Sequence, residues 1–363
     1  MAKDKKLLIF IPSIEDGGVE KNLYLISNFL TNKIKEITLI TYDQSKKKKI
    51  NKKIKIRNPV FNFSFLKGRY PKYFLCLILL IKTFLINRNY VVLSFQANIY
   101  VIILCKLFGI KVISRSNSSS MGWSKNFLKQ FIFSYYFKRA DRIIVNSYDF
   151  KKEMDKRYKI KTYCILNPFK FLNIKKSSNE KAEKIFSQNA LKIISVGRLT
   201  LQKDFLTLLQ AIKHVKKKKI ELVILGKGSE YSNLLNYIDR NNLDDKVRLI
   251  GYKKNPFKYI KQSQIFILTS IFEGSPNVLI EAQYLNKYII STNCPTGPRE
   301  ILNNGKYGSL VKIKDYKKIA KIIDNFKYNQ LVKKKIKRGF KNVKNYDYEK
   351  NCYKYYNLIK LYI

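Results

Sequence analysis

Histidine and acidic residues are scarce in this sequence. Its 363 residues include one His, His214, and 25 Asp or Glu against 73 Lys or Arg. A single imidazole excludes a metal site built from several histidines. The cysteines are odd in number and form no CxxC pair, which excludes a disulfide framework or a zinc ribbon and favours a reduced, cytoplasmic setting. They stand far apart, at Cys76, Cys105, Cys164, Cys294 and Cys352.

Lysine, in contrast, is abundant. The formal net charge is +48, and the basic residues divide into 61 Lys and 12 Arg. A very basic chain suggests a nucleic-acid-binding protein, but Arg is the residue that reads bases and phosphates with paired hydrogen bonds. Residues 1–175 hold 35 basic and 10 acidic residues and residues 176–363 hold 38 and 15, so no basic tail exists. We therefore expect no nucleic-acid partner, but attraction to anionic lipid surfaces and diphosphate substrates.

Long hydrophobic runs are also missing. The run at residues 74–86 has about 13 residues and one charge, whereas a membrane-spanning helix needs about 20. Two interpretations stay open for residues 67–88: a buried helix, or a helix that dips into a membrane surface beside Lys67, Arg69 and Lys72. The N-terminus has only a short apolar run, so no signal peptide is expected.

Short strands and helices alternate along both halves of the chain. Helical spacing of apolar residues is seen at 19–30, 204–216 and 231–238. This alternation is typical of an α/β protein with parallel sheets that are covered on both faces. The predicted strands are 7–11, 37–41, 91–95, 111–115, 142–145, 191–196, 220–225, 247–250, 265–268 and 288–290.

A polar stretch without a strand signal divides the chain. We predict a Rossmann-like domain over residues 1–175, a linker over 176–190, a second Rossmann-like domain over 191–345 and a closing helix over 346–363. Ligands of such domains bind at the carboxyl ends of the parallel strands.

Two cations follow the predicted strand at 191–196. Gly197 ends the strand, and Arg198 and Lys203 stand five residues apart before the next helix. A guanidinium and an ammonium at this place suit a diphosphate, although two surface cations would give the same pattern. Gly226 follows the predicted strand at 220–225 as Gly197 follows the strand at 191–196. It predicts either main chain that packs against the flat base of a nucleotide or a simple Gly-rich turn.

The segment 272–282 is the most informative part of the sequence. Ser275 is typical of an N-cap and Pro276 of a first helical residue, so a helix is predicted directly after Gly274. Its first N–H groups can hold a pyrophosphate. Glu273 precedes this helix, and Glu281 lies about five residues, or about 8 Å, into it. Apolar neighbours indicate that the Glu281 carboxylate is buried and does not lie on a solvated face.

Gly17 and Gly18 separate the first strand from the first helix. They allow a backbone to approach an anion closely, or they simply make a tight turn. Their spacing is not GxGxxG, which counts against an NAD-dependent enzyme.

Taken in order, these motifs carry a family resemblance. Gly-Gly-Val-Glu at 17–20, Gly-Arg-Leu with Gln-Lys-Asp-Phe at 197–205, and Glu-x7-Glu at 273–281 resemble the family 4 retaining glycosyltransferases. The resemblance implies the GT-B fold: two Rossmann-like domains facing a central cleft, with a C-terminal helix closing back on the N-terminal domain. The string at 293–302 is similar to enzymes that build bacterial surface polysaccharides, such as capsule or lipopolysaccharide, and lipid-linked oligosaccharides.

The resemblance also implies roles for the matching positions. Arg198 and Lys203 would neutralise the donor diphosphate as it leaves, and Glu273 would contact the transferred sugar. The N-terminal domain would bind the acceptor and the C-terminal domain the nucleotide-sugar, with no metal and no cofactor. The residues implied to bind the donor are Gly17, Gly18, Gly226, Gly274, Ser275, Pro276, Asn277, Val278 and, on the ribose, Glu281.

One family feature is missing from the N-terminal half. Family members often carry a His near the transferred sugar, and here the single His214 lies instead in the predicted helix 204–216, which indicates a surface or packing role. Gln96 or Asn98 is a candidate polar substitute for that His. Arg115, which ends another strand, is a candidate contact for an anionic acceptor.

The function implied by the resemblance is retaining transfer of a hexose or N-acetylhexosamine. The donor would be a nucleotide-sugar, a UDP-sugar before a GDP-sugar, and the acceptor a growing surface glycan or a polyprenyl-diphosphate-linked oligosaccharide. We expect a cytoplasmic protein, peripheral on the inner face of the plasma membrane. Three alternatives are a nucleotide-sugar epimerase of GT-B-like architecture, a basic nucleic-acid-binding protein and a non-catalytic glycan-binding relative.

Overall fold

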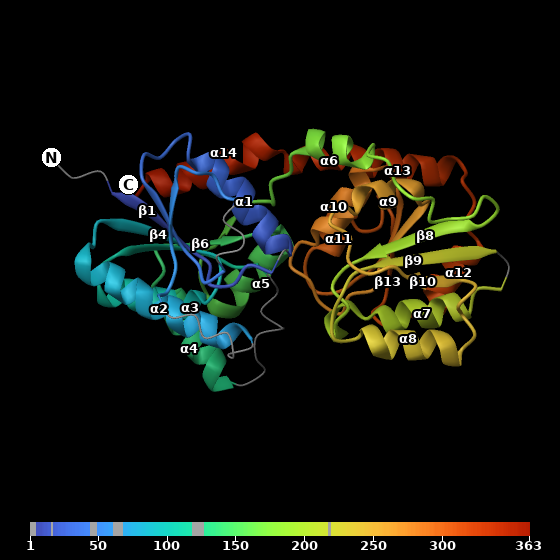
Figure 1. Cartoon of the computed structure of the whole chain (residues 1–363), viewed down its shortest axis with the longest axis horizontal. Helices are drawn as coiled ribbons and strands as arrows, with labels where there is room; N and C mark the ends of the chain where they lie inside the picture. The colour runs from blue at the N-terminus through green and yellow to red at the C-terminus, as the bar shows by residue number, and fades with distance from the viewer. Residues whose placement is uncertain (1–4, 16, 44–48, 61–67, 118–126, 217–218) are drawn as a thin grey trace. The chain divides into compact units, whose positions relative to one another are not determined.

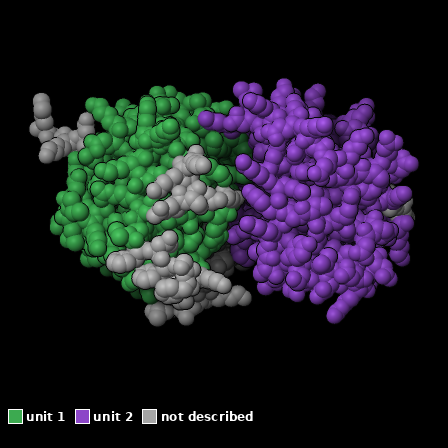
Figure 2. Space-filling view, viewed as in Figure 1, with its two compact units in different colours: residues 1–169, 346–363 green, residues 170–345 purple. Residues whose placement is uncertain are grey.

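The chain folds into two compact units (Figure 2), and each has a parallel sheet of its own (Figure 1). The computed structural model describes residues 5–15, 17–43, 49–60, 68–117, 127–216 and 219–363. Unit 1 comprises residues 1–169 and 346–363, and unit 2 comprises residues 170–345. The chain therefore leaves unit 1 and returns to it for the last helix.

Unit 1 is built on a seven-stranded sheet with the order β3-β2-β1-β4-β5-β6-β7. Alternate residues of β1 point to opposite faces, with Leu7 and Ile9 in one hydrophobic cluster and Leu8 and Phe10 in another. A parallel sheet of this kind buries both faces and needs helices on each. The strands are β1 (Lys6–Phe10), β2 (Ile37–Ile40), β3 (Ile54–Arg57), β4 (Tyr90–Ser94), β5 (Lys111–Arg115), β6 (Arg142–Val145) and β7 (Tyr163–Cys164).

Two sets of helices cover the sheet of unit 1. Apolar residues of α1 and α14 pack on the face of Leu7, and those of α2, α3, α4 and α5 pack on the face of Leu8. The C-terminal helix thus closes back on the N-terminal unit, as expected. Within the described residues no helix unites the length and the apolar content that a membrane crossing requires. The helices are α1 (Gly18–Leu30), α2 (Arg69–Ile86), α3 (Asn98–Leu107), α4 (Phe127–Phe137), α5 (Tyr148–Tyr158) and α14 (Tyr348–Lys360).

A buried guanidinium fastens α14 to the sheet. Arg115, at the end of β5, is fully buried; its Nε donates to Tyr355 Oη at 2.8 Å and its Nη2 to Asn167 Oδ1 at 2.8 Å. The guanidinium also lies over the Phe95 ring, 5.4 Å from its centroid. The expectation that Arg115 faces an acceptor is therefore wrong, because the side chain serves the interior of unit 1.

Unit 2 has a six-stranded parallel sheet with the order β10-β9-β8-β11-β12-β13. Its main core joins the central strands to apolar residues of α7, α8, α12 and α13. The strands are β8 (Leu191–Val196), β9 (Ile220–Leu225), β10 (Val247–Leu249), β11 (Ile265–Leu268), β12 (Tyr288–Thr292) and β13 (Ser309–Val311). The α-helices are α6 (Phe171–Ser178), α7 (Phe205–Lys213), α8 (Tyr231–Arg240), α9 (Phe257–Gln262), α10 (Asn277–Tyr284), α11 (Pro298–Ile301), α12 (Tyr316–Asp324) and α13 (Gln330–Asn342).

The stretch 176–190, predicted as a linker, packs as part of unit 2. Just before it, the Phe171 ring of α6 lies 4.8 Å from the Tyr284 ring of α10. Gln262 Nε2 donates to the Glu183 carbonyl at 2.9 Å, so the polar residues of this stretch contact α9. Unit 2 therefore begins at residue 170, before α6. The polar segment belongs to unit 2 because its main-chain groups form hydrogen bonds with that unit.

We predict that Tyr355→Phe lowers the free energy of unfolding by about 1–3 kcal/mol. The substitution leaves Arg115 Nε without an acceptor in a site closed to water. Tyr353→Phe, on the exposed side of the same helix, is the matched control and should change stability by less than about 0.5 kcal/mol. Urea unfolding followed by circular dichroism measures both, and equal values for the two variants would contradict the role given to Arg115.

Candidate active site

The candidate site of unit 2 lies where three neighbouring strands end. β8, β11 and β12 are adjacent in the sheet, and because all are parallel their carboxyl ends lie at one edge. Each runs into a loop singled out from the sequence: 197–203 after β8, 269–276 after β11 and 293–297 after β12. Ligands of open parallel sheets bind at this edge.

A buried ion pair joins two of these loops. Lys203, at the end of the short 3-10 helix Leu201–Lys203, lies with its Nζ 2.5 Å from Glu273 Oε1. Ser270 Oγ donates to the same carboxylate oxygen at 2.6 Å. The Lys203 and Glu273 side chains are only 14% and 8% exposed, so both charges have lost most of their water and depend on each other.

Hydrogen bonds hold the loops in register around this pair. Gln202 Nε2 donates to the Phe272 carbonyl at 2.8 Å, and Thr269 Oγ1 donates to the Lys203 carbonyl at 3.0 Å. Thr296 Oγ1, from the third loop, donates to the Glu273 carbonyl at 2.6 Å. The sequence motifs include Gln202 and Thr296 but gave these side chains no role, because only the tertiary structure shows which carbonyl each one meets.

The helix α10 begins one residue later than predicted. Asn277 is its first residue and Pro276 takes the N-cap position with extended backbone, so Ser275 lies before the cap. Pro276 has no N–H to donate, and its own carbonyl accepts from Leu279 N at 3.1 Å. The first helical N–H groups therefore belong to Asn277 and Val278. Their position beside Gly274 is the one expected for a pyrophosphate site.

Glu281 is buried in α10, as its apolar neighbours predicted. It lies four residues after the first helical residue, which is about 6 Å along the axis. Its side chain belongs to a residue only 2% exposed, so it does not lie on a solvated helix face.

Two glycines make room for the 197–199 loop. A Cβ on Gly226 would lie 1.9 Å from the Gly197 carbonyl oxygen, and one on Gly228 would lie 2.1 Å from the Leu199 carbonyl oxygen. Leu199 N also donates to the Lys227 carbonyl at 3.0 Å. Gly226 thus has a packing reason of its own, and its contact with a base stays a prediction. Arg198, between these contacts, is exposed to solvent.

Cys294 lies in the third loop and is not a candidate nucleophile. Burial raises the pKa of its thiol to about 12, and the Glu273 carboxylate acts in the same direction. The thiol therefore stays protonated at neutral pH. In the described part of the chain, no three His, Cys, Asp or Glu side chains gather as metal ligands would.

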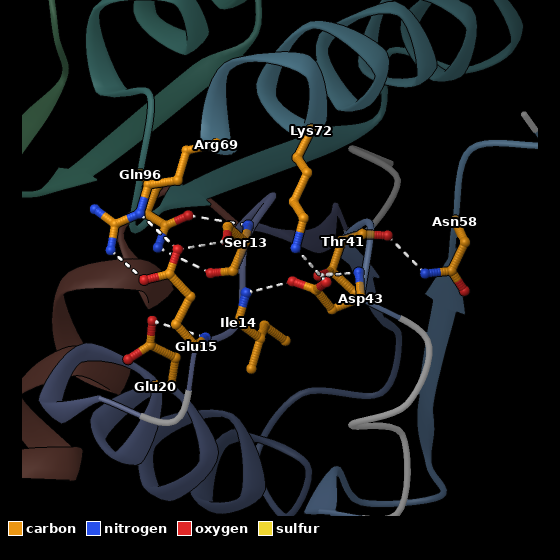
Figure 3. A network of polar contacts seen from close by, with 10 residues as sticks. All are labelled: Ser13, Ile14, Glu15, Glu20, Thr41, Asp43, Asn58, Arg69, Lys72 and Gln96. Atoms are coloured by element: carbon orange, nitrogen blue, oxygen red, sulfur yellow. Dashed lines mark hydrogen bonds and ion pairs between the residues drawn. The ribbon is translucent and has the colours of Figure 1, made fainter. Parts of the chain in front are cut away.

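The glycine pair of unit 1 lies next to Glu20, which belongs to a network of charged and polar residues (Figure 3). Gly17 caps α1 with extended backbone, and Gly18 is the first helical residue. Glu20, buried in the first turn, accepts from Glu15 N at 3.4 Å, and Arg69 Nε donates to Glu15 Oε1 at 2.6 Å. The amino end of α1 thus carries an acid of its own, which any phosphate approaching Gly17 would meet.

The proposed substitutes for the missing His are engaged within unit 1. Gln96 accepts from Ser13 N at 3.0 Å and donates to the Ser13 carbonyl at 2.9 Å, so its amide holds the strand end of β1 (Figure 3). Asn98 donates to the Arg115 carbonyl at 3.0 Å. Both amides therefore have a structural role, and their part as substitutes for the His stays a prediction. His214 is exposed at the C-terminal end of α7, with Nδ1 2.9 Å from the Gln210 carbonyl oxygen, in agreement with the predicted surface or packing role.

Comparisons with known proteins agree with these motifs. Residues 176–343 match the family model described as Glycosyl transferases group 1. An uncharacterized glycosyltransferase of Methanocaldococcus jannaschii is 33% identical over 255 residues, 60% of this chain, and the match spans 63% of that protein's length. N-acetylgalactosamine-N,N'-diacetylbacillosaminyl-diphospho-undecaprenol 4-alpha-N-acetylgalactosaminyltransferase of Campylobacter jejuni is 29% identical over 340 residues, 85% of this chain and 86% of that one.

Solved structures give the fold. The Anabaena protein HepE, in complex with UDP and glucose, superposes with a TM-score of 0.81 at 15% identity, covering 98% of this chain and 99% of that one. The chain therefore resembles glycosyltransferases of the family 4 type, and the predicted GT-B fold class is confirmed. These relatives give no support to an epimerase or to a nucleic-acid-binding protein.

We predict that Gly297→Ala lowers the free energy of unfolding by about 2 kcal/mol more than Gly251→Ala. Both glycines have positive φ, +87° and +72°, so both variants carry a similar backbone strain. Only at Gly297 would the new Cβ lie 2.4 Å from the Gly274 carbonyl oxygen and displace the loop before α10; at Gly251 nothing lies within 4 Å. Urea unfolding measures the difference, and equal losses would refute the close approach.

Proposed function

We propose that this protein transfers a hexose or N-acetylhexosamine from a UDP-sugar to a glycan acceptor with retention of configuration and without a metal ion. The observation that carries the proposal is the convergence of Lys203, Glu273 and the amino end of α10 at one edge of the unit 2 sheet. These are the positions at which the family motifs match. A cation, a carboxylate and helix N–H groups at one place provide what a sugar diphosphate requires.

In this mechanism Lys203 and Arg198 stabilise the departing diphosphate. An ammonium has three N–H donors, and the ion pair with Glu273 uses one of them. The others are available for phosphate oxygens, so Lys203 can bind a diphosphate while still paired. As the bond between the sugar anomeric carbon and the phosphate oxygen breaks, negative charge grows on UDP beside these cations and beside the amino end of α10.

The two carboxylates divide between the two ends of the donor. We assign Glu273, held by Ser270 and Lys203, to hydroxyls of the transferred sugar. Glu281, about 6 Å along α10, is assigned to the ribose. Asn277 and Val278 supply N–H groups between them, and the other donor-binding residues expected from the sequence stay predictions.

The acceptor is proposed to be a sugar on a polyprenyl diphosphate or a growing surface glycan. The Campylobacter jejuni relative supports this, since its name describes a diphospho-undecaprenol acceptor and it matches 85% of the chain. A lipid-linked acceptor places the enzyme at a membrane surface, and the net charge of +48 favours an anionic one. We therefore propose peripheral association with the cytoplasmic face of the plasma membrane.

We predict that Lys203→Met reduces kcat/KM for a UDP-sugar donor about 100-fold or more, because the departing diphosphate loses a preorganised cation. Lys213→Met, at the exposed end of α7, is the matched control and should keep full activity. UDP release is measured over a panel of UDP-sugars with polyprenyl-diphosphate-linked acceptors. Full activity of Lys203→Met would contradict the mechanism.

Two further measurements test this result. One separates loss of the site from loss of the fold, and the other tests for epimerisation. Lys203→Met leaves the Glu273 carboxylate buried without its cation, so the double variant Lys203→Met, Glu273→Gln should recover thermal stability but no activity. Product analysis with donor alone, in the absence of acceptor, tests for epimerisation, for which we expect no product.

We predict that an excess of chelator leaves the turnover unchanged and that the product keeps the anomeric configuration of the donor. The reason is that the cation and the helix N–H groups of this site take the place of a metal at the diphosphate. Turnover is measured by UDP release with and without EDTA, and the anomeric configuration by proton NMR. Loss of activity that Mg²⁺ or Mn²⁺ restores would refute the metal-independent proposal, and an inverted product would refute retention.

A further inference from the structure

Large apolar side chains lie exposed along one face of α2. Tyr70, Phe74 and Ile78 follow one another at a spacing of four residues, which places them on one side of the helix, and Ile86 continues the exposed apolar surface at its end. The opposite side of α2 is buried in unit 1 through residues such as Cys76 and Leu80. The helix therefore has two apolar faces, of which the sheet covers only one.

The same property extends over the neighbouring helices α3 and α4. Tyr100 and Leu107 are exposed on α3, and Phe131 and Tyr135 on α4. α3 contacts both α2 and α4, and all three pack on the same face of the sheet (Figure 1). Their outer sides therefore form one surface, which we call the apolar face. On the opposite side of unit 1, α1 exposes no large apolar side chain within its described residues 18–30.

The helices of the apolar face contribute only basic charges, and the acids that pair with some of them, Glu15, Asp43 and Asp141, come from other segments. The sequence from residue 44 to residue 140, between Asp43 and Asp141, contains 20 Lys or Arg and no Asp or Glu. The net charges of residues 1–175 and 176–363 are similar and do not show this acid-free stretch. α2, α3 and α4 all lie within it.

Several cations are placed at the apolar face itself. Lys82 continues the four-residue spacing of α2 and is exposed, and Lys138 is exposed directly after α4. The Arg139 guanidinium lies 3.4 Å from the centroid of the Tyr135 ring. Basic side chains among exposed aromatic and aliphatic ones match the interfacial zone of a membrane, with acyl chains below and anionic headgroups at the rim.

We propose that the apolar face of α2, α3 and α4 docks unit 1 on an anionic lipid bilayer. The proposal rests on the membrane association proposed above and names the surface responsible for it. Charge decides between a bilayer and a second copy of the chain. A symmetric dimer through this face would bring together helices whose own charged residues are all basic, whereas anionic headgroups neutralise the same cations.

The test compares two sets of substitutions in the full-length protein. Phe74→Ser, Leu107→Ser and Phe131→Ser, combined, remove one apolar side chain from each helix; these residues are 65%, 75% and 64% exposed. The matched control combines Leu172→Ser, Leu331→Ser and Leu361→Ser, which are 80%, 62% and 65% exposed and lie on other elements. Binding to vesicles of phosphatidylglycerol and phosphatidylcholine is measured by co-sedimentation, and UDP binding by calorimetry.

We expect the first set to bind vesicles about tenfold or more weakly than the unsubstituted protein, and the control within about twofold. Vesicles of phosphatidylcholine alone, or Lys82→Gln with Lys138→Gln, should also weaken binding. Unchanged UDP binding in the first set separates this result from the proposed chemistry. Equal vesicle binding by both triple variants would overturn the proposal. Loss of self-association without loss of vesicle binding would overturn it as well and would identify a dimer interface.

Discussion

The structure depends on one constraint: a fully parallel sheet must be covered by helices on both faces. Each pair of parallel strands needs a crossover connection, usually a helix, that carries the chain back, so every strand ends at the same edge. In unit 2 this rule brings the loops after β8, β11 and β12 together, and with them Lys203, Glu273 and the first turn of α10. The chemistry of the site therefore follows from the way in which the strands are covered.

The same constraint explains the role of the C-terminal helix. With α2 to α5 on one face of the unit 1 sheet, α1 shares the other face with α14, which arrives from the far end of the chain. Arg115 completes this arrangement, because its guanidinium has no access to water and finds an acceptor in Tyr355 of α14. A buried Arg costs free energy unless it is hydrogen-bonded, so the end of the chain is part of the unit 1 interior.

Burial also gives the two carboxylates of the site their significance. A Lys-rich chain with few acids has many cations with which a surface carboxylate could pair. Glu273 and Glu281 are both buried, which costs desolvation free energy that a surface carboxylate avoids, and buried carboxylates of this kind are typical of functional sites. The absence of acids is informative as well. Residues 44–140 contain no Asp or Glu, and the helices that expose apolar side chains lie within this stretch.

Much of the fold could be predicted from the sequence. β5, β6, β8, β9 and β11 have the bounds expected from their hydrophobic runs, because strands buried on both faces are continuously apolar. β3, β7 and β13 were missed, since they are short edge strands whose residues are only partly buried. The linker prediction differed from the structure for a related reason: residues 176–190 are polar, but their partners lie about 80 positions away on α9.

The sequence by itself determined the class of fold, the order of the motifs and the family resemblance, because hydrophobic periodicity and motif spacing are local properties. Only the tertiary structure decided what the individual side chains do. It paired Lys203 with Glu273, placed Pro276 at the cap of α10, turned Arg115 inward and engaged Gln96 with Ser13. Each of these outcomes depends on a partner distant in the chain, and partners of that kind are fixed by packing and hydrogen-bond geometry, which a local pattern does not contain.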